Sequence, residues 1–334
     1  MELLLKNVTT VEGELIDKRV AVEGMSKYKE MTFDFSGHFI YPGLTNWHDH
    51  LEMNLYPKLG TPPYNNYTEW MKDIYKPKES PLKEIEKTDI DYRLMWGALK
   101  NLISGVTTVY HHNPSRRIIR KDSFPVFVPE IAWAHSLAIE KKISYKKDRP
   151  FVIHAGEGVD DFAANETAQL DKLGLLKENT YVVHGISADW NLIDRKGASV
   201  IWCPSSNLYM FNKTADVKNR KNVFLGTDST LTGSPTLLDE IRVAKQFASK
   251  EEIYRMVTKN SIGFFIAKKK LDNAIDNLFS LEPKDISMAV SRGRIRLQEG
   301  KPVGIDVKKL REHFERKVGY PILGTNPLWG LIVS

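Results

Sequence analysis

Two histidines separated by a single residue are the side chains of this sequence best suited to chemistry. His48 and His50 follow residues 39–44, an apolar run that contains a Pro-Gly pair. In an extended strand, residues i and i+2 point to the same face, so both imidazoles can aim at one point, as metal ligands must. Taken alone, such a pair is also common on surfaces and in cores. It becomes informative because residues of the same kind recur farther along the chain.

Three further apolar runs end in residues of the same chemical kind. His154, His184 and Asp228 each follow directly on a run of apolar residues that is typical of a buried strand. A divalent cation held by imidazole and carboxylate groups is one way to satisfy such residues. For each residue alone, a buried side chain bonded to a backbone carbonyl is the alternative. Five of them at equivalent strand ends favour a metal site.

An acid stands close to one of these histidines. Glu157 lies three residues after His154, and Gly156 between them permits a tight turn. A carboxylate beside a metal-bound water can take its proton and pass it to a leaving group. Capping of the following helix is the alternative role for an acid here. We favour a proton shuttle, because the neighbouring histidine is a candidate ligand.

The composition is that of a globular protein of modest charge. The chain has 334 residues, of which 42% are hydrophobic and 27% charged, and its formal net charge is +6. No nucleic-acid-binding motif accompanies the positive charge, which argues against a nucleic-acid partner. The single cysteine, Cys203, excludes an internal disulfide and favours a reducing compartment. No signal-like N terminus and no run of about 20 apolar residues is present, so we predict a cytoplasmic protein that does not enter membranes.

The strand pattern divides the chain into three parts. Residues 43–274 alternate apolar strands with longer amphipathic segments, which is typical of a parallel sheet covered on both faces. Their length, roughly 230 residues, is close to the ~250 of a (β/α)8 TIM barrel, so we predict an α/β fold of that class. Residues 1–42 and 275–305 contain short strands and turns. We predict that they form one small β-sandwich domain from both chain ends.

Two regions depart from a regular barrel. The stretch between Asn113 and Pro150 is short for strands 3 and 4 with their helices, because one βαβ unit takes about 30 residues or more. We expect residues 124–129 to be one of these strands and the barrel to be either trimmed or irregular around strands 3 and 4. Residues 306–334 are predicted to form a C-terminal helix and an apolar tail. The tail is expected to dock on its own barrel or on a second subunit of a homodimer.

The chain resembles the metal-dependent amidohydrolase superfamily. It resembles most the branch that holds guanine, cytosine, adenosine-type and S-adenosylhomocysteine-type deaminases and the triazine chlorohydrolases. The resemblance covers most of the chain, including a lid-like segment at 67–70. It rests on motifs that occur in the same order along the chain: Pro-Gly-Leu at 42–44 before His48-x-His50, His-Ala-Gly-Glu at 154–157, Val-His-Gly at 183–185, Cys-Pro-Ser-Ser-Asn at 203–207 and Gly-Thr-Asp at 226–228.

This resemblance implies a role for each candidate residue. The implied ligands of one Zn²⁺ or Fe²⁺ are His48, His50, His154 and Asp228. Asp228 would also accept a proton from the attacking water, with Glu157 as proton shuttle and His184 beside the site, orienting the water or the developing oxyanion. Some members bridge two metals with a lysine or a glutamate at the end of strand 4. No lysine lies between Val126 and Ser136, and Glu130 is the alternative bridging acid, but we expect one metal.

The predicted reaction is hydrolysis of a non-peptide carbon–nitrogen bond in a small molecule. Deamination of a heterocyclic amine by a metal-bound hydroxide is the leading hypothesis. A cyclic-amide or imidazolone-ring hydrolase on the same metal centre is one alternative, and a non-catalytic structural relative is another. The residues predicted to contact the substrate are His112, Trp70 and Asn207.

Overall fold

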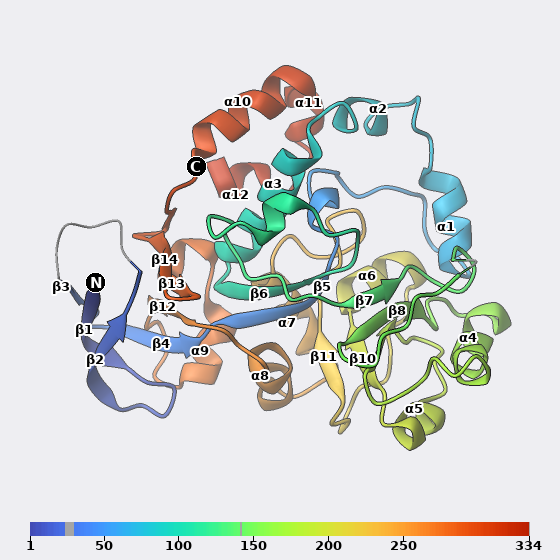
Figure 1. The fold of residues 1–334 in the computed structure, drawn as a ribbon, viewed down its shortest axis with the longest axis horizontal. Coiled ribbons are helices and arrows are strands. Elements are labelled where there is room, and N and C mark those ends of the chain that lie inside the picture. The colour runs from blue at the N-terminus through green and yellow to red at the C-terminus, as the bar shows by residue number, and fades with distance from the viewer. Residues whose placement is uncertain (24–29, 141, 334) are drawn as a thin grey trace.

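The strands of the described residues fall into three sheets, and Figure 1 shows their arrangement. The computed structural model describes residues 1–23, 30–140 and 142–333, so residues 24–29 of the predicted N-terminal β-region lie outside the described residues. One sheet has eight strands, one has five and one has two. None of the described helices reaches the length and apolarity that crossing a bilayer requires.

Both ends of the chain contribute to the eight-stranded sheet. Tyr41 of the N-terminal part lies opposite Phe265 of the C-terminal part, with the ring centroids 4.9 Å apart. Figure 1 shows the blue and the orange-red strands side by side at this seam. The predicted strand-turn-strand near the C terminus is confirmed as β13 and β14. The strands are β1 (Glu2–Thr9), β2 (Leu15–Ala21), β3 (Glu30–Asp34), β4 (His38–Pro42), β12 (Phe264–Lys268), β13 (Ile286–Ser291), β14 (Arg294–Gln298) and β15 (Lys301–Pro302).

The strands that carry the candidate site are parallel, as predicted. Five of them form a sheet in the order β11-β10-β9-β8-β7, and β5 pairs with β6. Nearly all of their residues are buried, which explains their continuous apolar runs. The strands are β5 (Leu44–Asp49), β6 (Val106–His111), β7 (Ala132–Ala134), β8 (Phe151–Ala155), β9 (Thr180–His184), β10 (Ser199–Trp202) and β11 (Val223–Leu225).

A backbone hydrogen bond connects the two parallel sheets on one side, and another ties β6 to the segment that leads into β7 on the other. After β11, the amide of Asp228 donates to the carbonyl of His48 in β5 at 3.0 Å. On the other side, the amide of Val109 in β6 donates to the carbonyl of Phe127 at 2.9 Å. These bonds place the ends of β5, β8, β9 and β11 around a common point, where the candidate residues lie.

The short region between β6 and β8 contains one strand and one isolated bridge. Of residues 124–129, predicted as a strand, only Phe127 pairs, and it bridges Thr108 of β6 in parallel. The chain then continues directly into β7, which pairs in parallel with β8. No helix separates Phe127 from β7 in the described residues, so one extended segment contacts β6 with its first part and β8 with its second. This segment accounts for the missing length.

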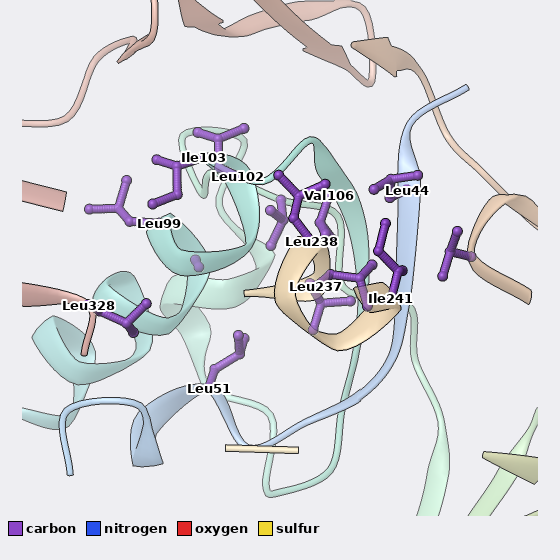
Figure 2. Close-up of a cluster of buried hydrophobic side chains, with 14 of the residues drawn as sticks. Leu44, Leu51, Leu99, Leu102, Ile103, Val106, Leu237, Leu238, Ile241 and Leu328 are labelled. Carbon is purple, nitrogen blue, oxygen red and sulfur yellow. The ribbon is translucent and has the colours of Figure 1, made fainter. Parts of the chain in front are cut away.

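Helices follow the parallel strands and bury their apolar faces on them. Figure 2 shows part of the hydrophobic core, with Leu99 and Leu102 of α3 on one side and Leu237 and Ile241 of α7 on the other, beside β5 and its Leu44. All five side chains are fully buried, and each contributes about 1.5–3 kcal/mol. The helices of this part are α1 (Tyr67–Ile74), α2 (Leu82–Ile85), α3 (Ile90–Leu102), α4 (Asp161–Lys172), α5 (Trp190–Lys196), α6 (Pro204–Phe211), α7 (Leu237–Ala244), α8 (Lys250–Thr258) and α9 (Ala274–Ser280).

The C-terminal tail packs on its own chain. It consists of α10 (Val307–Lys317), α11 (Tyr320–Leu323) and α12 (Trp329–Val333), which lie beside α3 in Figure 1. Phe314 and Trp329 both contact the ring of Trp96 in α3, at centroid distances of 5.6 and 5.4 Å. The side-chain amide of Asn326 donates to the carbonyl of Asn54 at 3.0 Å. Of the two predicted docking modes, the structure therefore contains the intramolecular one.

Candidate metal centre and active site

The four side chains predicted as metal ligands lie together at the ends of β5, β8 and β11. His48 Nε2 is 3.2 Å from His154 Nε2. Asp228 Oδ1 is 3.8 Å from the Nε2 atoms of both His48 and His50. Burial, followed by neighbouring imidazoles, holds the pKa of His48 and of His154 well below its usual range. These rings are therefore neutral and can offer a lone pair.

The geometry of these atoms suits a divalent metal. Tetrahedral Zn²⁺ with bonds of about 2.0–2.2 Å places its ligand atoms roughly 3.4 Å apart, and the three distances observed here lie between 3.2 and 3.8 Å. His154 Nδ1 donates to the carbonyl of His135 at 2.8 Å, which leaves the lone pair on Nε2. His48 Nε2 lies 3.2 Å from that nitrogen, a separation at which both nitrogens can ligate one cation.

A fourth histidine belongs to the same cluster. The ring of His112 stacks on that of His154 with centroids 4.5 Å apart, and its Nε2 donates to the carbonyl of Ala134 at 2.9 Å. Its Nδ1 has no hydrogen-bond partner among the described residues. His112, predicted to contact substrate, thus lies among the ligand candidates. Four imidazoles with ligand atoms within 4.8 Å of one another form this cluster: His48, His50, His112 and His154.

His184 and Asp228 adopt left-handed backbone conformations and are held by α6. Their φ angles are 73° and 56°, a region that costs a non-glycine residue about 1–3 kcal/mol and is frequent at functional sites. Ser206 Oγ donates to Asp228 Oδ2 at 2.9 Å, and His184 Nδ1 donates to Asn207 Oδ1 at 2.8 Å. Burial alone would raise the pKa of Asp228, but His50, His184 and hydrogen bonds lower it below its ordinary value.

Glu157 faces the ligand cluster from the turn after β8. Gly156 has a φ of 65°, and a Cβ there would come within 2.9 Å of the backbone nitrogen of Ala188, so glycine is required. The turn brings Glu157 Oε1 to 3.5 Å from His184 Nε2. Burial, and then the charges of Asp228 and Glu166, raises the pKa of Glu157 well above its ordinary value. This carboxyl can hold a proton inside the site.

Glu166 in α4 supports that turn and was not predicted. Its Oε2 accepts from the amide of Gly156 at 2.9 Å, and its Oε1 accepts from the hydroxyl of Tyr67 in α1 at 3.0 Å. Burial raises the pKa of Glu166 to about 7. The sequence contained a signal, since Glu166 shares one helix face with the buried Ala163 and Leu170. An acid on an apolar face requires buried partners.

A buried ion pair beneath the ligands was also missed. Asp49 points away from its neighbours His48 and His50, because side chains alternate along a strand. Lys100 of α3 lies 3.3 Å from Asp49 Oδ2, and both side chains are fully buried. The same ammonium donates to the carbonyl of Asp228 at 3.1 Å, so Lys100 ties the end of β5 to the end of β11. A lysine on the apolar face of an amphipathic segment was the available signal.

A cavity of about 210 Å³ opens onto the ligand cluster. Trp70, predicted to contact substrate, lines it. Asn207, with the same prediction, does not line it and instead lies behind His184. The lining residues are His50, Met53, Tyr67, Trp70, Met71, Ile74, Tyr75, His135, His154, Glu157, His184, Met210, Asp228, Ser229 and Leu231.

Known proteins of similar sequence are deaminases. A 5-methylthioadenosine/S-adenosylhomocysteine deaminase of Pyrococcus furiosus is 24% identical over 303 residues, which covers 69% of this chain and 71% of that protein. Guanine deaminase of Mus musculus is 31% identical over 137 residues, or 39% of this chain and 30% of that enzyme. No family model matches the chain.

The structure is similar to that of a zinc-containing hydrolase. A mutant of atrazine chlorohydrolase from Arthrobacter aurescens TC1, solved with zinc and atraton, aligns with a TM-score of 0.72 at 14% identity. The alignment covers 95% of this chain and all of the other. The deaminases of similar sequence confirm the resemblance to the amidohydrolase superfamily and the prediction of a hydrolase that acts on carbon–nitrogen bonds, and the structural neighbour supports the fold.

Proposed function

We propose that this protein deaminates a heterocyclic amine with one bound Zn²⁺. The observation that carries the proposal is the placement of Glu157, a carboxyl able to hold a proton, 3.5 Å from His184 and at the edge of the ligand cluster. A purely structural metal site needs neither an open cavity nor a proton donor. Deamination requires both, because the departing nitrogen must be protonated.

The side chains proposed to hold the metal are His48, His50, His154 and Asp228. Three imidazoles and one carboxylate are ligands that Zn²⁺ takes, and the donor separations given above fit a tetrahedral zinc site, so zinc is the metal of this proposal. When bound, the cation lowers the pKa of a water molecule and so supplies the nucleophile at neutral pH.

The remaining steps use groups of the chain itself. The ionised carboxylate of Asp228 can accept the proton that the attacking water loses. Glu157, which faces the same cavity, can donate a proton to the nitrogen of the substrate, and His184 can orient the oxygen that replaces it. The new carbon–oxygen bond forms as the carbon–nitrogen bond breaks, and the nitrogen leaves as ammonia.

The fold that presents these groups is proposed to be a TIM-type barrel that lacks one strand-helix unit. Hydrogen bonds between β5 and β11, and between β6 and the segment that leads into β7, support a closed arrangement. The proposed second domain combines residues 1–42 with 275–305, and the pairing of β12 with β4 extends it towards residue 264. This description agrees with the shortness of the region before Pro150.

Ammonia release from metal-loaded protein tests the proposal. Purified chain reconstituted with Zn²⁺ is offered aminopurines, aminopyrimidines and amino-triazines, with cyclic amides as a parallel panel. We expect ammonia from at least one amine, and a loss of about 10²–10⁴-fold in kcat when Glu157→Gln removes the proton donor but leaves the ligands intact. Folded, zinc-loaded protein that opens cyclic amides and releases no ammonia would contradict deamination.

A further inference from the structure

The roof of the active-site cavity is one apolar face of α1. Tyr67, Trp70, Met71 and Ile74 all line the cavity and follow the i, i+3, i+4, i+7 spacing of a single helix face. Additional apolar side chains complete this roof from the loops and from α6: Met53, Met210 and Leu231. Together with Met71 of α1, Met53 and Met210 form a soft, polarisable wall that adapts to alkyl and sulfur groups.

The polar atoms of this roof are already engaged. Trp70 Nε1 donates to the carbonyl of Leu59 at 3.1 Å. The hydroxyl of Tyr67 donates to Glu166 Oε1 at 3.0 Å. Tyr75, which also lines the cavity, is 71% exposed. A group that enters the roof therefore meets carbon, sulfur and the faces of aromatic rings.

Ionisable side chains of the cavity lie on its floor. Among the described lining residues there is no lysine or arginine, and the titratable groups other than tyrosines are His50, His135, His154, Glu157, His184 and Asp228. The lysine of α1, Lys72, is exposed on the other side of the helix. A carboxylate or phosphate placed under the roof would lose its water without gaining a countercharge, and an ammonium would fare no better.

The cavity is also small. Its volume of about 210 Å³ lies below the lower end of the ~300–1,000 Å³ typical of ligand pockets. The floor must accommodate the heterocycle next to Glu157. The remaining space suits one ring system with a short substituent that extends towards Met71 and Ile74.

We propose that the preferred substrate is an uncharged heterocyclic amine whose end remote from the metal centre carries a short apolar substituent, either an alkyl or a thioether group. This inference rests on the proposed deaminase function and specifies its substrate class. It separates substrates with an apolar substituent from substrates with a charged one, because the roof excludes a substituent that bears an amino-acid or phosphate group. Selectivity is assigned to α1, and the chemistry to the floor.

Matched substrate pairs test the inference. Each pair shares one aminopurine or amino-triazine ring and carries either a propyl or a carboxyethyl side chain of similar length. On the zinc-loaded full chain, we expect kcat/KM for the propyl compound to be higher by about 100-fold or more, because burying the carboxylate is costly. A ratio near one would overturn the inference, even if both compounds are deaminated.

Binding separates this inference from the function on which it rests. Calorimetry with Glu157→Gln, loaded with zinc, measures the affinity for the same pairs without turnover. If wild-type protein releases no ammonia while the propyl compounds still bind at least about 100-fold more tightly, the proposed function fails and the apolar selectivity stands. Equal affinities for both members of each pair overturn the selectivity.

A charge placed in the roof should reverse the preference. Met71→Arg puts a guanidinium where the carboxylate would lie, so we expect the propyl-to-carboxyethyl ratio to fall by at least about tenfold. Lys72→Arg introduces the same residue on the exposed side of α1 and should leave the ratio unchanged. Ile74→Lys provides a second position if the first variant does not fold. An unchanged ratio in folded roof variants would contradict the assignment of selectivity to α1.

Discussion

The floor and the roof of the cavity satisfy their polar atoms in different ways. On the floor, Asp228 accepts hydrogen bonds from α6 and from the residues that come after it, and His184 is fixed by Asn207. In the roof, the polar groups of Trp70 and Tyr67 are bound to partners outside the cavity, Leu59 and Glu166. The floor thus directs its polar groups at the reacting atoms, and the roof directs its polar groups away from them.

This difference separates chemistry from selection. Floor residues come from strand ends and are supported by buried networks, so their replacement should change metal binding, turnover or stability. Roof residues come from one helix, and their replacement should change which molecule enters. Substitutions in the floor and in the roof can each test whether catalysis and substrate selection are separate. The largest effects are expected from substitutions in the floor.

Removal of a ligand should have the largest effect. His154→Ala deletes the nitrogen that lies 3.2 Å from His48 Nε2, so we expect zinc affinity to fall by more than the ~10–100-fold typical of residues that only support a ligand, with turnover lost as well. Metal analysis after dialysis and ammonia release measure the two effects. Stoichiometric zinc together with full turnover in this variant would remove His154 from the site.

Loss of the buried lysine should damage the floor from below. Lys100→Met leaves Asp49 charged and unpaired in the interior, which typically costs about 3–5 kcal/mol. Urea unfolding should register this loss, and zinc affinity should fall about 10–100-fold because Lys100 also holds the carbonyl of Asp228. Lys83→Met on the exposed side of α2 is the matched control. Wild-type stability for Lys100→Met would show that the ion pair does not support the site.

A pH-dependent loss of stability is expected from Glu240. This buried carboxylate accepts from the amide of Ser205 at the start of α6, and burial raises its pKa from 4.5 to about 7. Because the folded protein favours the protonated form, the stabilisation is complete below pH 4.5 and is lost as the pH rises through about 7. Relative to Glu240→Gln, the free energy of unfolding of the wild type should fall by about 3 kcal/mol over that range.

Urea titrations of both proteins at about pH 4 and about pH 8 measure this difference. The exposed Glu251→Gln in α8 serves as the control and should show no such dependence. The prediction is wrong if the difference in free energy of unfolding between the wild type and Glu240→Gln is the same at both pH values. That result would mean that ionisation of Glu240 does not destabilise the folded protein.

The sequence predicted the floor better than the roof for a physical reason. His48, His50, His154, His184 and Asp228 end apolar strands, and parallel strands align their ends, so local patterns were sufficient to bring them together. The roof depends on where α1 lies relative to those strands, which is set by a loop and by the contact with Glu166. That contact spans 99 positions of the chain and has no local pattern.

The region before β8 shows a second limit of sequence patterns. Its shortness was evident, but a continuous segment that pairs with β6 at Phe127 and with β8 from Ala132 onward leaves no separate strand signals to find. Lys100 and Glu166 were overlooked for a related reason. Each is a single charged residue on an apolar helix face, and its meaning depends on partners from elements remote in the chain.

The smallest effect is expected at the point where floor and roof meet. Glu166→Ala removes both the acceptor of the Gly156 amide and the partner of Tyr67, so the turn that carries Glu157 loses its support. We expect kcat to fall about tenfold, as for a lost hydrogen bond of about 1.4 kcal/mol, while zinc stays bound. Glu166→Gln should restore most of this activity, because an amide can accept from Gly156 and donate to the hydroxyl of Tyr67.

Tyr67→Phe completes the comparison, because it removes only the hydrogen bond between α1 and Glu166. Glu166 still accepts from Gly156 in this variant, so kcat should stay near the wild-type value while KM rises a few-fold as α1 loses a tether. Steady-state kinetics of the three variants, with zinc content measured for each, resolves the two roles. If Tyr67→Phe lowers kcat as much as Glu166→Ala does, the roof takes part in the chemistry and the division between selection and catalysis fails at this contact.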